Sequence, residues 1–203
     1  MRKRELTKEP FNFIISGVGG QGNVLLSALV GAALLNEGFV ISVADTFGVS
    51  QRGGSVTSHI KISKKTLYSS VTLMGKADAI LGMEPVETLR TLVEFGNPHV
   101  TVIVNPRPVY PPGGVSYPDL DEVKKSIIEL SSKTKFVDAT EEALNMGNPI
   151  YTNIILLGSL VGADILPISK ETMMPILEER FPGSLLDINI KAFGRGMELI
   201  AKA

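Results

Sequence analysis

Residues 11–44 read FNFIISGVGGQGNVLLSALVGAALLNEGFVISVA, and this stretch decides the fold. Residues 11–16 are an apolar run typical of a short buried strand, and glycines end it abruptly. Over residues 21–36, apolar side chains recur at the three- and four-residue spacing of a helix, and Gly38 follows where a helix C-terminal glycine is expected. Residues 39–44 are again strand-like. The order strand, glycine turn, helix, strand predicts one βαβ unit.

The rest of the chain continues this alternation. Further strands are expected over 56–63, 79–82, 100–105 and 135–138, and helices over 85–95, 119–132, 153–161, 170–180 and 186–203. The run 56–63 alternates like a half-exposed strand, so we expect His59 to lie at the surface or at an interface. The pattern predicts an α/β, Rossmann-like fold with a largely parallel sheet flanked by helices. We expect a tail over 1–10 and a single domain over 11–203.

Composition restricts the classes of function. The 203 residues carry a net charge of −1 without a concentrated basic stretch, which disfavours nucleic-acid binding. No cysteine is present, so thiolate-ligated iron–sulfur clusters and cysteine zinc sites are excluded, and with only two histidines we expect no metal. No apolar run reaches the roughly 20 residues of a membrane span, and no signal-peptide segment is visible. We therefore expect a cytoplasmic protein that does not enter a membrane.

The glycine turn, defined here as residues 17–22, is the first candidate binding site. Gly17, Gly19 and Gly22 match G-x-G-x-x-G between a strand and a helix, where the backbone can approach a phosphate and the first helical amides face it. Asp45 ends the following strand at the distance expected of a ribose-binding carboxylate. Alternatively, the glycines only let strand and helix pack closely, and Asp45 only begins a turn.

A second candidate is Gln51-Arg52-Gly53-Gly54-Ser55. An arginine fork beside two glycines suits a phosphate, a pyrophosphate or the carboxylate of a neighbouring subunit. The alternative is a β-turn with a solvated arginine.

Catalytic side chains are not evident elsewhere. Glu84 and Glu87 stand three apart at a predicted helix start, where carboxylates favour the helix dipole, and we expect both to be structural. The serines show no histidine–aspartate partnership by spacing. The sequence therefore predicts no complete active site.

Four segments together carry a family resemblance: GVGGQGNVLLSALVGAAL (17–34), DTFGVSQRGGSVTSHIKIS (45–63), KADAILGMEPVETLR (76–90) and NPIYTNIILLGSLVGA (148–163). They resemble the gamma-type domain of 2-oxoacid:ferredoxin oxidoreductases over nearly the whole chain. The order of the segments and EPVETLR resemble most closely the beta subunit of indolepyruvate:ferredoxin oxidoreductase.

The resemblance implies a subunit that holds no cofactor alone. A cysteine-rich alpha subunit would bind thiamine diphosphate and the [4Fe–4S] clusters, and the complex would convert an aryl pyruvate and coenzyme A into aryl-acetyl-CoA and CO2 while reducing ferredoxin. It implies a possible coenzyme A contact and leaves the catalytic residues of this chain unknown. The implied ligand or interface residues are Gly17, Gly19, Gly20, Gln21, Gly22, Gln51, Arg52, Gly53 and Gly54.

Other interpretations stay open at this stage. The chain also fits a gamma subunit that serves pyruvate or 2-oxoisovalerate. From other classes, a self-sufficient dinucleotide-binding dehydrogenase would bind NAD(H) alone, and a nucleotide-sensing module would bind a nucleotide without turnover. The loop ligand can be coenzyme A, another nucleotide or none.

Overall fold

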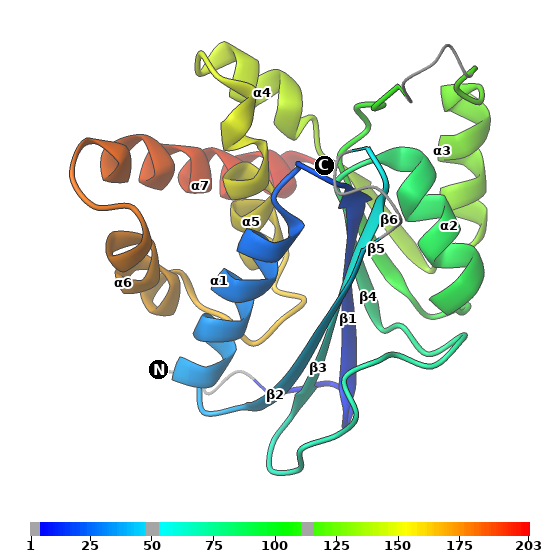
Figure 1. The fold of residues 1–203 in the computed structure, drawn as a ribbon, viewed down its shortest axis with the longest axis horizontal. Coiled ribbons are helices and arrows are strands. Elements are labelled where there is room, and N and C mark those ends of the chain that lie inside the picture. Colours follow the sequence, from blue (N-terminus) through cyan, green and yellow to red (C-terminus); the bar gives the residue numbers. More distant parts are fainter. Residues whose placement is uncertain (1–4, 48–52, 111–115) are drawn as a thin grey trace.

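The computed structural model describes residues 5–47, 53–110 and 116–203, which form a six-stranded sheet with helices on both faces (Figure 1). The strands are β1 (Phe11–Val18), β2 (Val40–Phe47), β3 (Ser55–Ser63), β4 (Ala79–Gly82), β5 (Thr101–Val104) and β6 (Lys133–Phe136). The helices are α1 (Asn23–Asn36), α2 (Pro85–Phe95), α3 (Leu120–Glu129), α4 (Ala139–Asn145), α5 (Thr152–Gly162), α6 (Lys170–Arg180) and α7 (Ser184–Lys202), with a 3-10 turn at Pro149–Tyr151.

The sheet is largely parallel, as the sequence predicts. Its order is β2-β3-β1-β4-β5-β6, and β1, β4, β5 and β6 pair in parallel. Strand β3 is antiparallel to both of its neighbours, so β2 runs in the direction of β1 again. The α/β fold class is confirmed.

The simple βαβ unit predicted for residues 11–44 needs a correction. Strands β1 and β2 are parallel and joined through α1, but β3 lies between them: His59 pairs with Ile14 of β1 on one side and with Ala44 of β2 on the other. A strand–helix–strand pattern specifies the direction of the second strand but not whether the two strands are neighbours. The next strand in the chain, β3, lies between β1 and β2.

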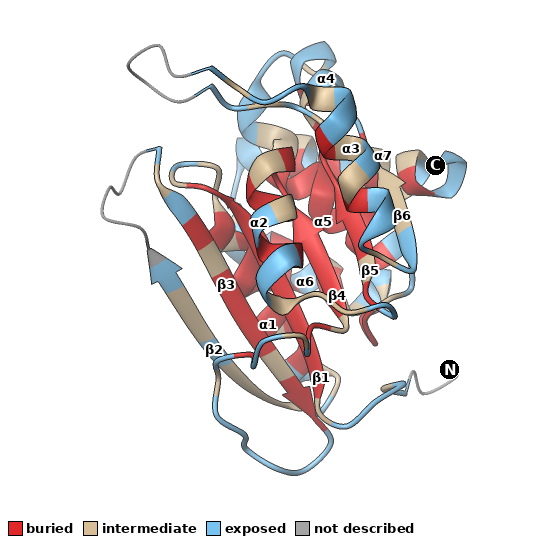
Figure 2. Cartoon of the chain, turned by 90° about the vertical axis from the view of Figure 1, so that its right-hand side faces the viewer, coloured by how far each residue is buried: buried red, intermediate tan, exposed pale blue. Residues whose placement is uncertain are grey.

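The two faces of the sheet bury separate apolar clusters. Phe13 and Ile15 of β1 face α1 and α5, while Ile14 faces α2, as the two-residue period of a strand requires. Helices α1, α5, α6 and α7 gather on one face and α2 and α3 on the other, and the buried residues lie between these layers and the sheet (Figures 1 and 2).

The prediction that His59 is a surface or interface side chain is wrong. The residue is 2% exposed, and its ring meets that of Phe95 edge to face at 5.0 Å. Because β3 is a central strand, the face that alternation suggested was half-exposed lies beneath the end of α2. Burial lowers the pKa of His59, and nearby Lys61 lowers it further, against an opposing effect of Asp45.

Helix ends follow local sequence signals. Ser169 caps α6 by accepting a hydrogen bond from the Thr172 amide at 3.0 Å. Helix α4 was not predicted, because it has only seven residues and follows β6 directly. At the other end, Lys8 pairs with Asp78 at 2.6 Å and β1 begins at Phe11; the division of the chain at residue 10 stays a prediction.

Candidate functional site

The glycine turn lies at the point in the sheet where the chain connections from two neighbouring strands lead to opposite sides. From β1 the chain passes through α1 to β2 on one side, whereas β4, the other neighbour of β1, leads through α2 on the opposite face. The carboxyl ends of β1 and β4 therefore flank a topological switch point, which is where open α/β sheets bind ligands. Both sets of loops that the sequence singled out converge there.

Backbone hydrogen bonds join the glycine turn to the second candidate motif. The Gly19 amide donates to the Gly54 carbonyl at 2.8 Å, and the Gly53 amide donates to the Gly19 carbonyl at 3.4 Å. The structure thus brings Gly53 and Gly54 to the turn. Gln51 and Arg52 lie outside the described residues.

Gln21 fixes the shape of the turn from within. Its Oε1 atom accepts a hydrogen bond from the Val18 amide at 2.7 Å, and its Nε2 atom donates to the Met83 carbonyl at 3.2 Å. A Cβ atom on Gly17 would lie 2.7 Å from that Oε1 atom and 2.9 Å from Oδ1 of Asn23. Gly17 and Gln21 therefore contribute to the packing of the turn. For Gly17 this agrees with the alternative that the glycines let strand and helix pack closely.

The start of α1 is open to an incoming anion. Gly22 precedes the helix with φ 91°, no side chain caps the first turn, and no acidic residue lies in that turn. The first amides of a helix have no intrahelical acceptors, and the helix dipole makes this end attractive to negative charge. A helix end that lacks a side-chain cap leaves those donors for a ligand.

Two cavities meet at this helix start. One of about 360 Å³ is lined by Val18, Gly19, Gly20, Gly22, Asn23, Val24 and Val56. A larger one of about 670 Å³ is lined by Gly20, Gln21, Gly22, Leu25, Met83, Arg107, Pro108, Val109, Thr140, Pro149, Ile150, Thr152 and Asn153. Neither lining contains an acidic side chain among the described residues, and the larger one includes Arg107, so the larger cavity suits an anionic ligand.

Asn153 and Arg107 are site residues that sequence reasoning missed. Asn153, in the first turn of α5, is 7% exposed, its amide lies against Gly22, and it has no hydrogen-bond partner among residues 5–47, 53–110 and 116–203. Arg107 is exposed at the rim, where no described carboxylate pairs with it. The segment NPIYTN contained Asn153, but nothing in its spacing linked it to the glycine turn.

Asp45 does not join this group. Within the described chain it lines neither cavity at the turn, and its carboxylate lies 3.5 Å from the Ser27 hydroxyl on the second turn of α1. Because β3 separates β2 from β1, the end of β2 is a full strand further from the glycine turn than in a simple βαβ unit.

A third cavity, the acidic cavity, lies beside the turn. It measures about 350 Å³ and is lined by Val18, Gly53, Gly54, Ser55, Glu84, Val86, Glu87, Arg90, Val109, Tyr110, Ser116, Tyr117 and Pro118. Glu84 caps α2 through the Glu87 amide at 2.9 Å and also accepts a hydrogen bond from the Tyr117 hydroxyl. Burial, then the hydrogen bond to Glu84, raises the pKa of Tyr117, so this hydroxyl keeps its proton and remains a donor.

Comparisons with known proteins show which family the chain belongs to. Residues 12–199 match the family model described as pyruvate ferredoxin/flavodoxin oxidoreductase. The chain belongs to this family. Among curated members, the indolepyruvate oxidoreductase subunit IorB of Thermococcus kodakarensis is 36% identical over 93% of this chain and 95% of its own length. Its counterpart from Archaeoglobus fulgidus is 32% identical over 91% and 92%.

Solved members of the pyruvate ferredoxin/flavodoxin oxidoreductase family share the fold. Subunit PORC of the pyruvate oxidoreductase from Thermotoga maritima superposes with a TM-score of 0.72 at 22% identity, covering 95% of this chain and 97% of that one. The 2-oxoglutarate:ferredoxin oxidoreductase from Magnetococcus marinus, with 2-oxoglutarate, coenzyme A and succinyl-CoA bound, gives 0.76 at 20% identity. That match covers 97% of this chain but only 32% of the other, so the present chain corresponds to about a third of that polypeptide.

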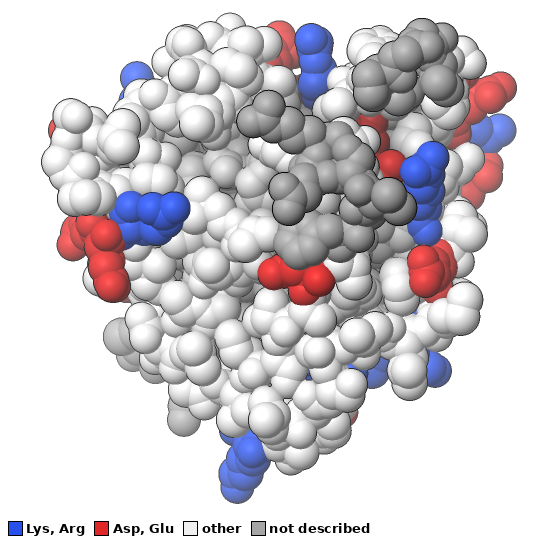
Figure 3. All heavy atoms as spheres, viewed as in Figure 1, with Lys and Arg blue, Asp and Glu red and all other residues white. Residues whose placement is uncertain are grey.

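Three further observations concern membrane spans, metal ligands and surface charge. None of the helices in the described ranges is long and apolar enough to cross a bilayer. No group of three or more potential metal ligands occurs among the described residues. On the face shown in Figure 3, the described acidic and basic side chains are interspersed and gather into no basic patch.

Proposed function

We propose that this chain is the beta subunit of a cytoplasmic indolepyruvate:ferredoxin oxidoreductase and that its cavities at the glycine turn bind the phosphate groups of coenzyme A. A cysteine-rich alpha subunit supplies thiamine diphosphate and the [4Fe–4S] clusters, and ferredoxin is reduced by the complex. The similarity to IorB subunits, at 30–36% identity over most of the chain, supports the subunit and its 2-oxoacid. Gamma subunits that serve pyruvate and ketoisovalerate follow at 29–30%.

The chemistry of this chain supports a non-redox role. Without cysteine it has no thiolate for a cluster, and its described residues form no metal-ligand group, so the electron path must lie in the partner. What the chain offers instead is a set of hydrogen-bond donors without carboxylates. These are the first amides of α1, the amide of Asn153 and the guanidinium of Arg107.

The observation that carries the coenzyme A proposal is the convergence of these donors on the 670 Å³ cavity. A phosphate at the helix start accepts hydrogen bonds from backbone amides, and Arg107 pairs with it at the rim. Held there, coenzyme A is positioned for a thioester-forming step in the partner.

The stand-alone dehydrogenase is a weaker candidate because of Asp45. Such an enzyme needs a carboxylate beside the phosphate loop to bind the ribose, and the described carboxylate at the end of β2 is held against α1 instead. NAD(H) binding by the isolated chain would restore this candidate.

The decisive experiment is to co-express the chain with its partner, purify the complex and measure 2-oxoacid-dependent ferredoxin reduction and coenzyme A affinity. We expect activity only in the complex, with indolepyruvate preferred over pyruvate and 2-oxoisovalerate. Arg107→Ala should raise the Kd for coenzyme A by about tenfold, the loss of one charge-assisted contact. The matched control is Lys125→Ala, an exposed cation on α3. Equal affinities in the two variants would contradict the proposed site.

A further inference from the structure

The acidic cavity contains a carboxylate oxygen to which none of residues 5–47, 53–110 and 116–203 donates a hydrogen bond. Glu87 is 7% exposed, and its Oε1 atom accepts a hydrogen bond from Arg90 at 3.0 Å. Its Oε2 atom is buried and has no hydrogen-bond partner among the described residues. A buried charged oxygen that has lost its water is costly unless a donor replaces that water, so an unpartnered one indicates a missing donor.

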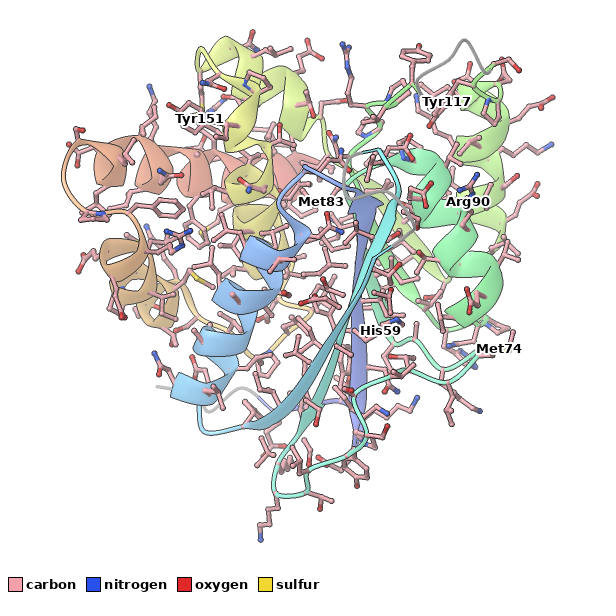
Figure 4. The ribbon with its side chains drawn as sticks, in the orientation of Figure 1. His59, Met74, Met83, Arg90, Tyr117 and Tyr151 are labelled. Carbon is pink, nitrogen blue, oxygen red and sulfur yellow. The ribbon has the colours of Figure 1, made fainter. Side chains whose placement is uncertain are left out.

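The neighbouring side chains that the structure describes do not supply this donor. Glu84 is fully engaged: its Oε2 atom accepts the Glu87 amide at 2.9 Å, and its Oε1 atom accepts the Val109 amide at 3.3 Å and the Tyr117 hydroxyl. Arg90 reaches only Oε1 of Glu87, and its side chain is 69% exposed. Figure 4 shows Arg90 on α2 and Tyr117 on the segment that leads to α3. One acceptor is therefore left over.

The chemistry of the cavity selects the class of its occupant. Among the described residues that line it, two carboxylates, from Glu84 and Glu87, face one guanidinium, from Arg90, so this wall favours a cation. A calcium ion takes about six to eight oxygen ligands, most of them from the protein, whereas the described residues leave one carboxylate oxygen free here, which is too few for a calcium site. One acceptor suits one N–H donor of an ammonium or a guanidinium group.

The mouth of the cavity indicates that this cation belongs to a protein. Tyr110 is 71% exposed there and meets Tyr117 edge to face at 5.5 Å, beside the exposed Arg90. Exposed tyrosine and arginine around a buried charged group are the composition of interface centres. Curated relatives are themselves named as oxidoreductase subunits, which supplies a partner for such a surface.

We propose that the acidic cavity receives a basic side chain of the partner subunit, an arginine or a lysine whose N–H group donates to Oε2 of Glu87. The proposal rests on the proposed function for the existence of that partner. It assigns the acidic cavity to assembly and the adjacent carboxylate-free cavities to coenzyme A. The two meet at Val18 and Val109, so docking of the partner closes one side of the ligand site.

The test uses Glu87→Gln, which keeps the shape of the side chain and removes its charge, in the co-expressed complex. We expect the Kd between the subunits to rise at least about tenfold and its salt dependence to weaken. The matched control is Glu94→Gln, the same change at an exposed position of the same helix, which should leave the Kd unchanged. A merely structural Glu87 would instead lower the Tm of the isolated variant, which we expect to stay within about 2 °C of the parent.

A second measurement separates this inference from the proposed function. N-methylguanidinium chloride is titrated into the isolated chain against sodium chloride at equal ionic strength. We expect the probe to raise the Tm of the parent chain and not that of Glu87→Gln. If the probe raises the Tm of the parent chain but Glu87→Gln leaves the Kd between the subunits unaltered, the assignment to the partner is overturned. If the probe does not raise the Tm of the parent chain and the Kd is also unaltered, the cation site is overturned. If the parent chain recruits no partner, the proposed function fails, while the probe still judges the cavity.

Discussion

The side-chain amide of Gln21 donates to the main-chain carbonyl of Met83 at 3.2 Å, and this contact joins the glycine turn to the loop that follows β4. The same side chain accepts the Val18 amide at 2.7 Å. One residue thus fixes the spacing between the two strand ends at the switch point. This spacing helps to set the shape of the cavities that lie on either side of the turn.

The two hydrogen bonds of the Gln21 side chain should make separate contributions to stability, which two substitutions distinguish. Gln21→Glu keeps the acceptor for the Val18 amide but loses the donor to Met83, whereas Gln21→Ala loses both and leaves a buried amide unpaired. We expect Gln21→Ala to lower the free energy of unfolding by about 1–3 kcal/mol and Gln21→Glu by less. Urea titration monitored by circular dichroism measures both. A larger loss for Gln21→Glu would show that repulsion between the new carboxylate and the Met83 carbonyl outweighs the retained bond to the Val18 amide.

The two glycines of helix α7 offer a contrast within three residues. A Cβ atom on Gly196 would lie 2.8 Å from the backbone nitrogen of Ser159 on α5, whereas a Cβ atom on Gly194 would meet nothing within 4 Å. Gly196→Ala should therefore destabilise the chain by about 1–3 kcal/mol through overpacking of the two helices. Gly194→Ala should stabilise it by about 0.5–1 kcal/mol, the usual gain in a helix interior.

Thermal and urea unfolding of both variants test this pair. The two substitutions are chemically identical and two positions apart. A general effect on the helicity of α7 would therefore change the free energy of unfolding of both variants in the same direction. Equal stabilisation of the two would mean that α5 and α7 are not in close backbone contact.

The free energy of unfolding should fall as the pH is lowered through the ordinary pKa of histidine. The pKa of His59 is lowered in the folded chain by burial, so below about pH 6.5 the unfolded chain takes up a proton that the folded chain does not. The unfolded state then binds more protons, and stability decreases with falling pH by up to about 1.4 kcal/mol per pH unit from this group.

Urea titrations between pH 7.5 and 5.5 measure this slope. His59→Gln should flatten it, because the titrating group is gone. His99→Gln, at an exposed position, should leave the slope unchanged. An unaltered slope in His59→Gln would assign the pH dependence to other groups.

Local patterns predicted most elements, and tertiary context decided the rest. Strand β4 and helices α2 and α6 have the bounds that apolar spacing and capping signals indicate, since Pro85 and Ser169 mark helix starts in the sequence itself. The position of β3 between β1 and β2 was not predictable, because pairing depends on segments far apart in the chain. His59 was misplaced for that reason, as its burial follows from the strand order and not from its neighbours in sequence.

The candidate site was predictable only in part, for the same physical reason. The glycine turn and Gly53-Gly54 carry their conformational signal locally, in residues that permit close backbone approach. Arg107, Asn153 and the unpartnered oxygen of Glu87 become recognisable only when loops after β1, β4 and β5 meet at one end of the sheet. Asp45 had the right spacing but lies on a strand that β3 displaces from the turn.

Asn153→Asp should separate ligand binding from folding at the glycine turn. The substitution preserves the size of the side chain and places a carboxylate in the first turn of α5, where the helix dipole offsets part of the cost of burying it, so the Tm should fall only slightly. The same charge faces the 670 Å³ cavity beside Gly22, where it repels a phosphate. We expect the Kd for coenzyme A in the complex to rise by about tenfold or more, measured by calorimetry. Asn189→Asp on α7, away from the described cavities, is the matched control. If both variants bind coenzyme A like the parent, the phosphate does not lie against α5, and the smaller cavity at Asn23 becomes its place.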